Sequence, residues 1–156
     1  MIILVTVGST RFDMLVQAVD RQSGEMKEDG HELVFQIGHG RYLPSGGRFF
    51  RFRDDMGPLY QKADVAITHG GVGTIFEALE AGCAVVGVDN PDLQEGHQAE
   101  LLEALDDEGV IVWCHDLGRI PELVKTALDL PSYSPPKSNL ALEIVKVLEG
   151  KGGGGN

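Results

Sequence analysis

Basic residues are scarce in this chain. Its 156 residues include 13 Lys and Arg against 24 Asp and Glu, so the formal net charge is −11 and the isoelectric point is near 4.7. Nucleic acids and anionic lipid surfaces are bound through clusters of Lys and Arg. The composition therefore argues against both as direct partners. It leaves room for a diphosphate ligand, since backbone dipoles and one local Arg suffice to hold that group.

Cysteines are few and long apolar stretches are absent. Cys83 and Cys114 each lie at the edge of an apolar run, so we expect core thiols rather than a disulfide or a metal pair, and a reducing cytosol as the compartment. No apolar run approaches the roughly 18 to 20 residues that cross a bilayer. The opening MIILVTVGS has no basic segment before its apolar residues, and we expect a core strand there rather than a secretory signal.

Aromatic residues make up only 6% of the chain, whereas glycine is abundant. The apolar residues are mainly Val, Leu, Ile and Ala, which is typical of an α/β protein, and the length fits one domain. β-branched apolar runs alternate with stretches of helical spacing. Strands are expected at 2–7, 33–37, 48–53 (at an edge of the sheet), 65–67, 84–88 and 110–113, and helices at 12–27, 56–63, after the glycines at 70–73, and at 97–106, 120–130 and 139–148.

This alternation predicts a single Rossmann-like domain with a mostly parallel, doubly wound sheet. In such sheets ligands lie outside the carboxyl ends of the strands. Three loops are then expected at one edge, namely Gly8 to Thr10, His69 to Thr74, and Asn90 to Gln98.

The stretch DVAITHGGVGTIFEALEAG, residues 64–82, is central to this prediction. A strand, a glycine turn and a helix make an anion site, because the first helical turn has unpaired N–H groups and partial positive charge. Glycines allow close approach of a phosphate, and Thr74 adds a hydroxyl. The turn lacks the third glycine of a dinucleotide fingerprint and the Lys of a nucleoside triphosphate loop, so a simple tight connection stays open as an alternative.

Three segments carry a resemblance to a known family. They are VTVGSTRFDMLV, ITHGGVGTIFEALEAG and VVGVDNPDLQEGHQAELLEALDDEG, in this order and spacing. Together they resemble the soluble catalytic subunit of the eukaryotic dolichol-linked N-acetylglucosaminyltransferase, which is similar to the C-terminal half of the bacterial lipid II glycosyltransferase. The resemblance runs from Met1 to about Leu130 and is weakest in residues 38–55. It implies the donor-binding half of a GT-B glycosyltransferase.

The resemblance implies a uridine diphosphate N-acetylglucosamine (UDP-GlcNAc) site on the shared edge. Its implied contacts are Gly8, Ser9 and Thr10 at the diphosphate, Gly70, Gly71, Gly73 and Thr74 around the nucleotide, Glu77 at the ribose hydroxyls, and Gln98 near the sugar. His97 stands where the bacterial relatives have a glutamine, so this chain departs from the pattern there. For Glu77, a solvated helix position is the alternative interpretation.

The implied reaction transfers N-acetylglucosamine with inversion to the 4-hydroxyl of a lipid-linked N-acetylglucosamine. It needs stabilisation of the leaving diphosphate and a base for the acceptor proton. We consider His69 first as the base, then Glu95 and His97, while a structural role for His69 is the common alternative. No metal-ligand spacing is visible, so we expect no catalytic metal and no cofactor besides the donor substrate.

The resemblance also implies a partner. Enzymes of this architecture close two domains around donor and acceptor, and this chain corresponds to the donor half. A membrane-anchored subunit at the cytosolic face of the endoplasmic reticulum would supply the other half, without direct membrane insertion of this chain. We expect residues 1–130 to form the donor domain, 131–150 a proline-rich linker and an amphipathic helix that docks the partner or packs on its own sheet, and 151–156 a disordered glycine tail. A donor subunit of a bacterial exopolysaccharide transferase, or a binding module without catalysis, remains an alternative.

Overall fold

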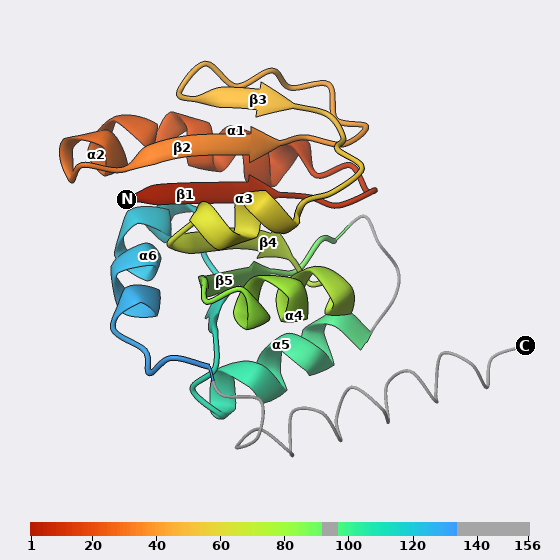
Figure 1. The fold of residues 1–156 in the computed structure, drawn as a ribbon, viewed down its shortest axis with the longest axis vertical. Helices are drawn as coiled ribbons and strands as arrows, with labels where there is room; N and C mark the ends of the chain where they lie inside the picture. Colours follow the sequence, from red (N-terminus) through yellow and green to blue (C-terminus); the bar gives the residue numbers. More distant parts are fainter. Residues whose placement is uncertain (92–96, 134–156) are drawn as a thin grey trace, which may run out of the picture.

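The computed structural model describes residues 1–91 and 97–133, with only the backbone of His97. This part of the chain forms one six-stranded sheet in the order β3-β2-β1-β4-β5-β6, and every neighbouring pair is parallel (Figure 1). The predicted doubly wound sheet is confirmed and is parallel throughout its described strands. These strands are β1 (Ile2–Thr6), β2 (Glu32–Gln36), β3 (Arg48–Phe50), β4 (Val65–His69), β5 (Ala84–Val88) and β6 (Val112–Cys114).

Helices cover both faces of the sheet. The helices are α1 (Asp13–Arg21), α2 (Ser23–Glu28), α3 (Gly57–Lys62), α4 (Val72–Glu80), α5 (His97–Asp107), the short 3₁₀ helix η1 (Leu117–Arg119) and α6 (Ile120–Leu128). Apolar residues of α1, α2 and α6 share one buried cluster, and those of α3, α4 and α5 share the other. In Figure 1, α3, α4 and α5 lie in front of the sheet and α1 and α2 behind it.

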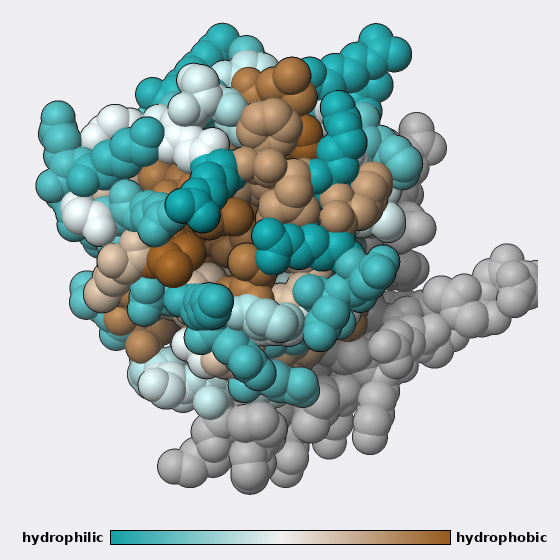
Figure 2. Space-filling model, turned by 45° about the horizontal axis from the view of Figure 1, so that its top comes forward, coloured by the Kyte–Doolittle hydropathy of each residue, from teal (hydrophilic) through white to brown (hydrophobic). Residues whose placement is uncertain are grey.

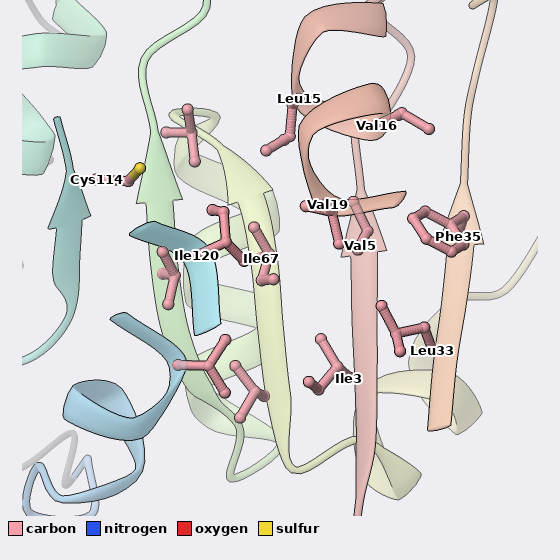
Figure 3. Close-up of a cluster of buried hydrophobic side chains, with 14 of the residues drawn as sticks. Ile3, Val5, Leu15, Val16, Val19, Leu33, Phe35, Ile67, Cys114 and Ile120 are labelled. Carbon is pink, nitrogen blue, oxygen red and sulfur yellow. The ribbon is translucent and has the colours of Figure 1, made fainter. Parts of the chain in front are cut away.

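The central strands are continuously apolar because both of their faces are covered. On β1, Ile3 and Val5 belong to the cluster under α1, whereas Leu4 belongs to the opposite cluster. Figure 3 shows Ile3 and Val5 on the same side of the sheet as Leu15 and Val19 of α1. Burial on both faces is the usual reason that parallel strands lack alternating polarity.

The predicted helix 12–27 is two helices with a break at Gln22. The Gln22 side chain leaves the helical surface to donate to the carbonyl of Leu117 at 2.7 Å and to accept from the N–H of Ile120 at 3.2 Å. Ser23 and Gly24 follow, and both have modest or poor helix propensity. A side chain bound across the fold and a weak local sequence together end α1 early.

The strand predicted at 48–53 ends at Phe50, and it is an edge strand as expected. Arg51 is exposed, and its guanidinium donates to the carbonyls of Gly38 and Gly40 at 3.1 and 2.7 Å, while the Gly38 N–H still donates to the Arg51 carbonyl at 3.1 Å. The basic and aromatic segment RFFRFR, residues 48–53, therefore continues past the end of the strand.

The β2–β3 crossover contains a loop, residues 37–47, instead of a helix. Two carboxylates of α1 hold this loop against the domain. Asp13 accepts from the N–H groups of Arg41 and Tyr42, and Asp20 accepts from the Tyr42 hydroxyl and the N–H groups of Ser45 and Gly46. These bonds satisfy backbone groups that a helix would pair internally.

Some predicted segments lie outside the described residues. The helix predicted at 139–148 and the tail at 151–156 lie outside them, as does the loop at 92–96. Among the helices of residues 1–91 and 97–133, none combines the length and the apolar character needed to cross a bilayer.

Both cysteines are buried free thiols, which confirms the expectation of core thiols. Cys83 donates to the carbonyl of Tyr60 at 3.0 Å, which links the start of β5 to the end of α3. Burial raises the pKa of the Cys83 thiol to about 11, and burial also raises the pKa of Cys114.

We therefore expect neither thiol to react quickly in the folded protein. A thiol reacts as its thiolate, and a raised pKa leaves little thiolate at pH 8. Titration with a chromogenic disulfide reagent should show two slow thiols in buffer and two fast thiols in guanidinium chloride. A fast thiol under native conditions would contradict the burial described above.

Candidate functional site

The strand order reverses between β1 and β4, which lie side by side at the centre of the sheet. The chain leaves β1 toward α1 on one face and leaves β4 toward α4 on the other. A crevice opens at such a switch point, outside the carboxyl ends of the two strands. A ligand site is therefore expected at the carboxyl ends of β1 and β4.

The three predicted turns do meet at this edge. Gly8 lies against the His69 ring, so that a Cβ on Gly8 would be 2.7 Å from His69 Nε2. Gly70 lies against Gln98, because a Cβ added to Gly70 would be 2.9 Å from the Gln98 Cβ. Asn90 donates from Nδ2 to the carbonyl of Arg11 at 3.1 Å. The first two turns therefore share one edge with Asn90 and Gln98, the two ends of the third loop.

A pocket of about 230 Å³ lies at the switch point on the α3–α4 side. It brings together four of the predicted site residues, Gly8, Ser9, Thr74 and Glu77. Its full lining is Thr6, Gly8, Ser9, Gln36, Phe52, Arg53, Met56, Tyr60, Thr74 and Glu77. The remaining predicted residues that the structure describes, Thr10, His69, Gly70, Gly71, Gly73 and Gln98, belong to the adjoining turns and do not line it. Glu95 and the side chain of His97 are outside the described residues.

The β1–α1 turn offers fewer free donors than its sequence indicates. Gly8 has φ of +63°, and its N–H already donates to Gln36 Oε1 at 2.9 Å. Thr10 directs both its N–H and its hydroxyl to the carbonyl of Val7, at 3.2 and 2.6 Å. In the described part of the chain, Ser9 has no hydrogen-bond partner for its N–H or its hydroxyl. Gly8 thus allows a ligand to approach the backbone of the turn closely, and Ser9 supplies the hydrogen-bond donors.

The β4–α4 turn ends in an open helix N-terminus. Gly71 is the N-cap, and no acidic residue occupies the first turn of α4, all of which the structure describes. A Cβ placed on Gly73 would meet no atom within 4 Å, so the space beside it is open. The first-turn N–H groups and the helix dipole favour an anion here.

His69 is fixed between the two turns. Its Nδ1 accepts the N–H of Gly71 at 2.8 Å, and its side chain is 6% exposed. Burial lowers the pKa of His69 below its ordinary value of 6.5, so the ring is neutral at pH 7. A neutral imidazole that accepts at Nδ1 carries its proton on Nε2. The Nε2–H therefore points toward Gly8 as a donor.

Glu77 is exposed on α4 and lies where two hollows join. A neighbouring hollow of about 580 Å³ shares Met56, Tyr60 and Glu77 with the pocket. Asp54, Asp55 and Glu80 also line this second hollow. Its acidic lining disfavours phosphate and suits hydroxyl or N–H donors of a ligand.

Six lining residues of the pocket were not among the predicted site residues: Thr6, Gln36, Phe52, Arg53, Met56 and Tyr60. Arg53 is the only basic side chain among the described lining residues, and its guanidinium lies over the Phe50 ring at 4.6 Å. Tyr60 is 3% exposed, and burial raises the pKa of its hydroxyl above the ordinary 10.0, while hydrogen bonding to Thr6 and Thr74 opposes the rise. The rule that placed three loops at one edge also applies to the residues after β3, and it could have indicated Arg53.

Gln98 Oε1 is buried and has no hydrogen-bond partner in the described structure. Within residues 1–91 and 97–133, no three His, Cys, Asp or Glu side chains are grouped so that they could hold a metal ion. Gln98 therefore presents a spare acceptor beside Gly70.

The buried neutral His69 predicts a loss of stability in mild acid. Its folded pKa is lower than its unfolded pKa, so below about pH 6.5 the unfolded chain takes up a proton that the folded chain does not. The free energy of unfolding should fall with pH in that range, with a His69 contribution of up to about 1.4 kcal/mol per pH unit. His69→Asn keeps an acceptor for the Gly71 N–H and cannot titrate.

Guanidinium unfolding of both proteins between pH 5 and 7.5 measures the difference. The other histidines contribute equally to both curves, so subtraction isolates His69. Parallel curves for the two proteins would show that the ring is not buried in its neutral form.

Comparison with known proteins finds a family match along almost the whole chain. The model of the glycosyltransferase family 28 C-terminal domain matches residues 2–148. The UDP-N-acetylglucosamine transferase subunit ALG13 of Homo sapiens is 36% identical over 122 residues, which are 72% of this chain and 11% of that protein. The UDP-N-acetylglucosamine--N-acetylmuramyl-(pentapeptide) pyrophosphoryl-undecaprenol N-acetylglucosamine transferase of Christiangramia forsetii is 29% identical over 104 residues, which are 63% of this chain and 28% of that protein. The matched region is thus a small part of either relative.

A solved structure supports the fold. The glycotransferase of kitacinnamycin has a TM-score of 0.66 and 21% identity, and the match covers 96% of this chain and 39% of that one. The single parallel sheet has the fold of the C-terminal half of a GT-B glycosyltransferase. Since the family model matches residues 2–148 out of 156, the chain belongs to glycosyltransferase family 28, as a C-terminal domain of that family.

Proposed function

We propose that this chain is the donor-binding catalytic subunit of an inverting N-acetylglucosaminyltransferase. Its donor is UDP-GlcNAc, and its acceptor is the 4-hydroxyl of N-acetylglucosamine on dolichyl diphosphate, in the assembly of the N-glycan precursor. The observation that carries the proposal is the pocket at the β1–β4 switch point, where Ser9, Thr74 and Glu77 converge. The identity to the ALG13 subunit over 72% of the chain supports the choice of donor.

The polarity of the pocket suits one orientation of this donor. Ser9, Arg53 and the N-terminus of α4 offer donors and positive charge, which suit the diphosphate. Glu77 and the acidic hollow beside it suit the ribose hydroxyls and the uracil N–H. The sugar then points toward Gly70 and Gln98 on the adjoining turns. Gly73 and Thr74 lie at the helix end between these groups.

The bonding of His69 supports a role on the leaving-group side. A general base needs a free lone pair, and Nε2 carries the proton while Nδ1 holds Gly71. Abstraction by His69 would require the ring to exchange tautomers and lose that bond. An Nε2–H donor is instead suited to the negative charge that develops on the departing diphosphate.

The acceptor proton then goes to another group. Glu95 and His97 are the remaining candidates for the base, and both precede Gln98 at the start of α5. A base must reach the acceptor hydroxyl directly or through one water. We propose that one of these two residues takes the proton when the acceptor is bound.

We propose that a membrane-anchored partner supplies the acceptor half at the cytosolic face of the endoplasmic reticulum. The pocket lies at the surface, and Phe52 both lines it and is 49% exposed. Figure 2 shows hydrophobic side chains among hydrophilic ones on the side of the molecule that bears β3. A covering domain would bury this apolar rim and exclude water from the transfer. In this arrangement residues 1–130 bind the donor, and the segment 131–150 docks on the partner.

Two experiments test this function. Calorimetric titration with UDP-GlcNAc, UDP-glucose and UDP-galactose should show preference for the first. Reconstitution with a candidate membrane subunit should give transfer to dolichyl diphosphate N-acetylglucosamine, and neither chain alone should turn over at that rate. Preference for another sugar would favour a bacterial exopolysaccharide transferase, and binding without turnover would favour a module without catalysis.

The ribose role of Glu77 predicts a specific loss of donor affinity. Glu77→Ala removes a carboxylate that accepts two hydroxyl donors, and affinity for UDP-GlcNAc should fall about tenfold or more. Glu103→Ala is the matched control, because Glu103 is an exposed glutamate on helix α5 that lines neither the pocket nor the neighbouring hollow. Calorimetry on both variants measures the difference. Equal affinities would remove Glu77 from the site and leave the fold assignment untouched.

A further inference from the structure

Gln36 is a buried polar residue of the pocket lining to which the proposed function gives no role. It is the last residue of β2, with Thr6 of β1 and Phe50 of β3 as its register partners, and it is 3% exposed. A polar side chain at such a position must satisfy its hydrogen bonds within the protein. Its partners therefore reveal what it holds in place.

The Gln36 amide makes five hydrogen bonds. Its Oε1 accepts from the Thr6 hydroxyl at 2.6 Å, from the Val7 N–H at 3.0 Å and from the Gly8 N–H at 2.9 Å. Its Nε2 donates to the carbonyls of Gly8 and Arg51, at 2.8 and 2.7 Å. A flipped amide would place its NH₂ against two N–H groups and its oxygen against two carbonyls. The partners therefore fix the orientation of the amide.

These bonds join two sides of the pocket. The N–H and the carbonyl of Gly8 are both held by this one side chain, which sets the plane of the turn just before Ser9. The Arg51 carbonyl, just before Phe52 and Arg53, accepts from the same amide and from the Gly38 N–H. Ser9 and Arg53 both line the pocket, and they are the groups assigned above to the diphosphate.

We propose that Gln36 is a positioning residue for donor binding, which sets the spacing between Ser9 on the β1–α1 turn and Arg53 on the β3–α3 loop. The inference rests on the proposed function, since the ligand held between these groups is the diphosphate of the nucleotide sugar. Gln36 itself does not need to touch the donor. Its contribution is that both sides of the site are already in place when the donor arrives, which lowers the ordering cost of binding.

Gln36→Met tests this role directly. Methionine has a similar length and no amide, so all five bonds are lost. Dissociation constants for uridine diphosphate should rise about tenfold or more, since several hydrogen bonds hold the two sides of the pocket. In the reconstituted enzyme the KM for UDP-GlcNAc should rise by a similar factor, while kcat changes less than threefold.

Gln36→Glu is a second variant, which tests the two donated bonds separately if Gln36→Met does not fold. A carboxylate still accepts from Thr6, Val7 and Gly8, but it cannot donate to the carbonyls of Gly8 and Arg51. This variant should also bind uridine diphosphate more weakly, because the two bonds by which Gln36 links the Gly8 carbonyl to the Arg51 carbonyl are lost. Thermal unfolding establishes that each variant is folded at the temperature of the titration.

Gln22→Met is the matched control. Gln22 also bridges separate elements, with bonds to the carbonyls of Ala18 and Leu117 and from the N–H of Ile120. It lies on the α1–α6 side and does not line the pocket. This variant should lose thermal stability and still bind uridine diphosphate within twofold of the wild type.

The outcomes separate the inference from the proposed function. If the wild type binds uridine diphosphate and the Gln36 variants bind as well as Gln22→Met, the positioning role is wrong and the function stands. If the wild type binds neither uridine diphosphate nor UDP-GlcNAc, alone or with a partner, the proposed function fails and the role of Gln36 fails with it. A selective loss of affinity in the Gln36 variants supports both.

Discussion

The parallel pairing of β1 with β4 is the constraint on which the site depends. Because the two strands run side by side and their helices go to opposite faces, the chain diverges just beyond Thr6 and His69. The gap that opens cannot be closed by either helix. It is bounded instead by two turns whose backbones approach closely, and a side chain on Gly8 or Gly71 would collide with the His69 ring. The packing of one imidazole between two glycines thus sets the shape of this edge.

Satisfying the polar groups near this gap determines which of them are left for a ligand. The Gly8 N–H is bound by Gln36, the Gly71 N–H by His69, and the Thr10 groups by Val7. These bonds are internal supports, and they rigidify the turns without presenting anything to the pocket. Among the backbone groups and hydroxyls of these described turns, Ser9 and the first turn of α4 remain available. The donors of an anion site in this fold are therefore the groups that the internal hydrogen bonds leave unpaired. Substitutions in the supporting groups are expected to change the geometry of the turns that carry these donors.

The sequence predicted the sheet well because its signals are collective. Runs such as Ile2 to Val7 and Ala84 to Val88 are apolar over their whole length, which few alternatives to a covered parallel strand explain. Once the sheet is parallel, the carboxyl ends share an edge, so Gly8, His69 and Gly70 could be placed together without coordinates. The break of α1 at Gln22 depends in part on a side chain that binds groups distant in sequence, and no local pattern carries that part of the information.

The individual pocket residues were harder to predict for the same reason. Gln36 and Tyr60 are isolated polar residues in or beside apolar segments, and in the sequence they resemble any other polar residue at a strand end or on a short helix. Their importance comes from partners on β1, β3 and α4 that only the fold brings near. Arg53 was visible as the last residue of the strand predicted at 48–53, but strand periodicity alone could not show that it follows the end of β3 at the pocket.

Charge explains why the supporting geometry matters so much for an anionic donor. The chain carries a formal net charge of −11, so its overall field opposes a nucleotide diphosphate outside the pocket. Salt limits that opposition to roughly 8 to 10 Å at physiological ionic strength. Within this distance, fixed N–H groups, one guanidinium and a helix terminus must outweigh the acidic surroundings of Glu77, Asp54 and Asp55. Dipoles act strongly only when they are correctly aimed, so the affinity of such a site depends less on how many charges it has than on the buried side chains that hold its turns.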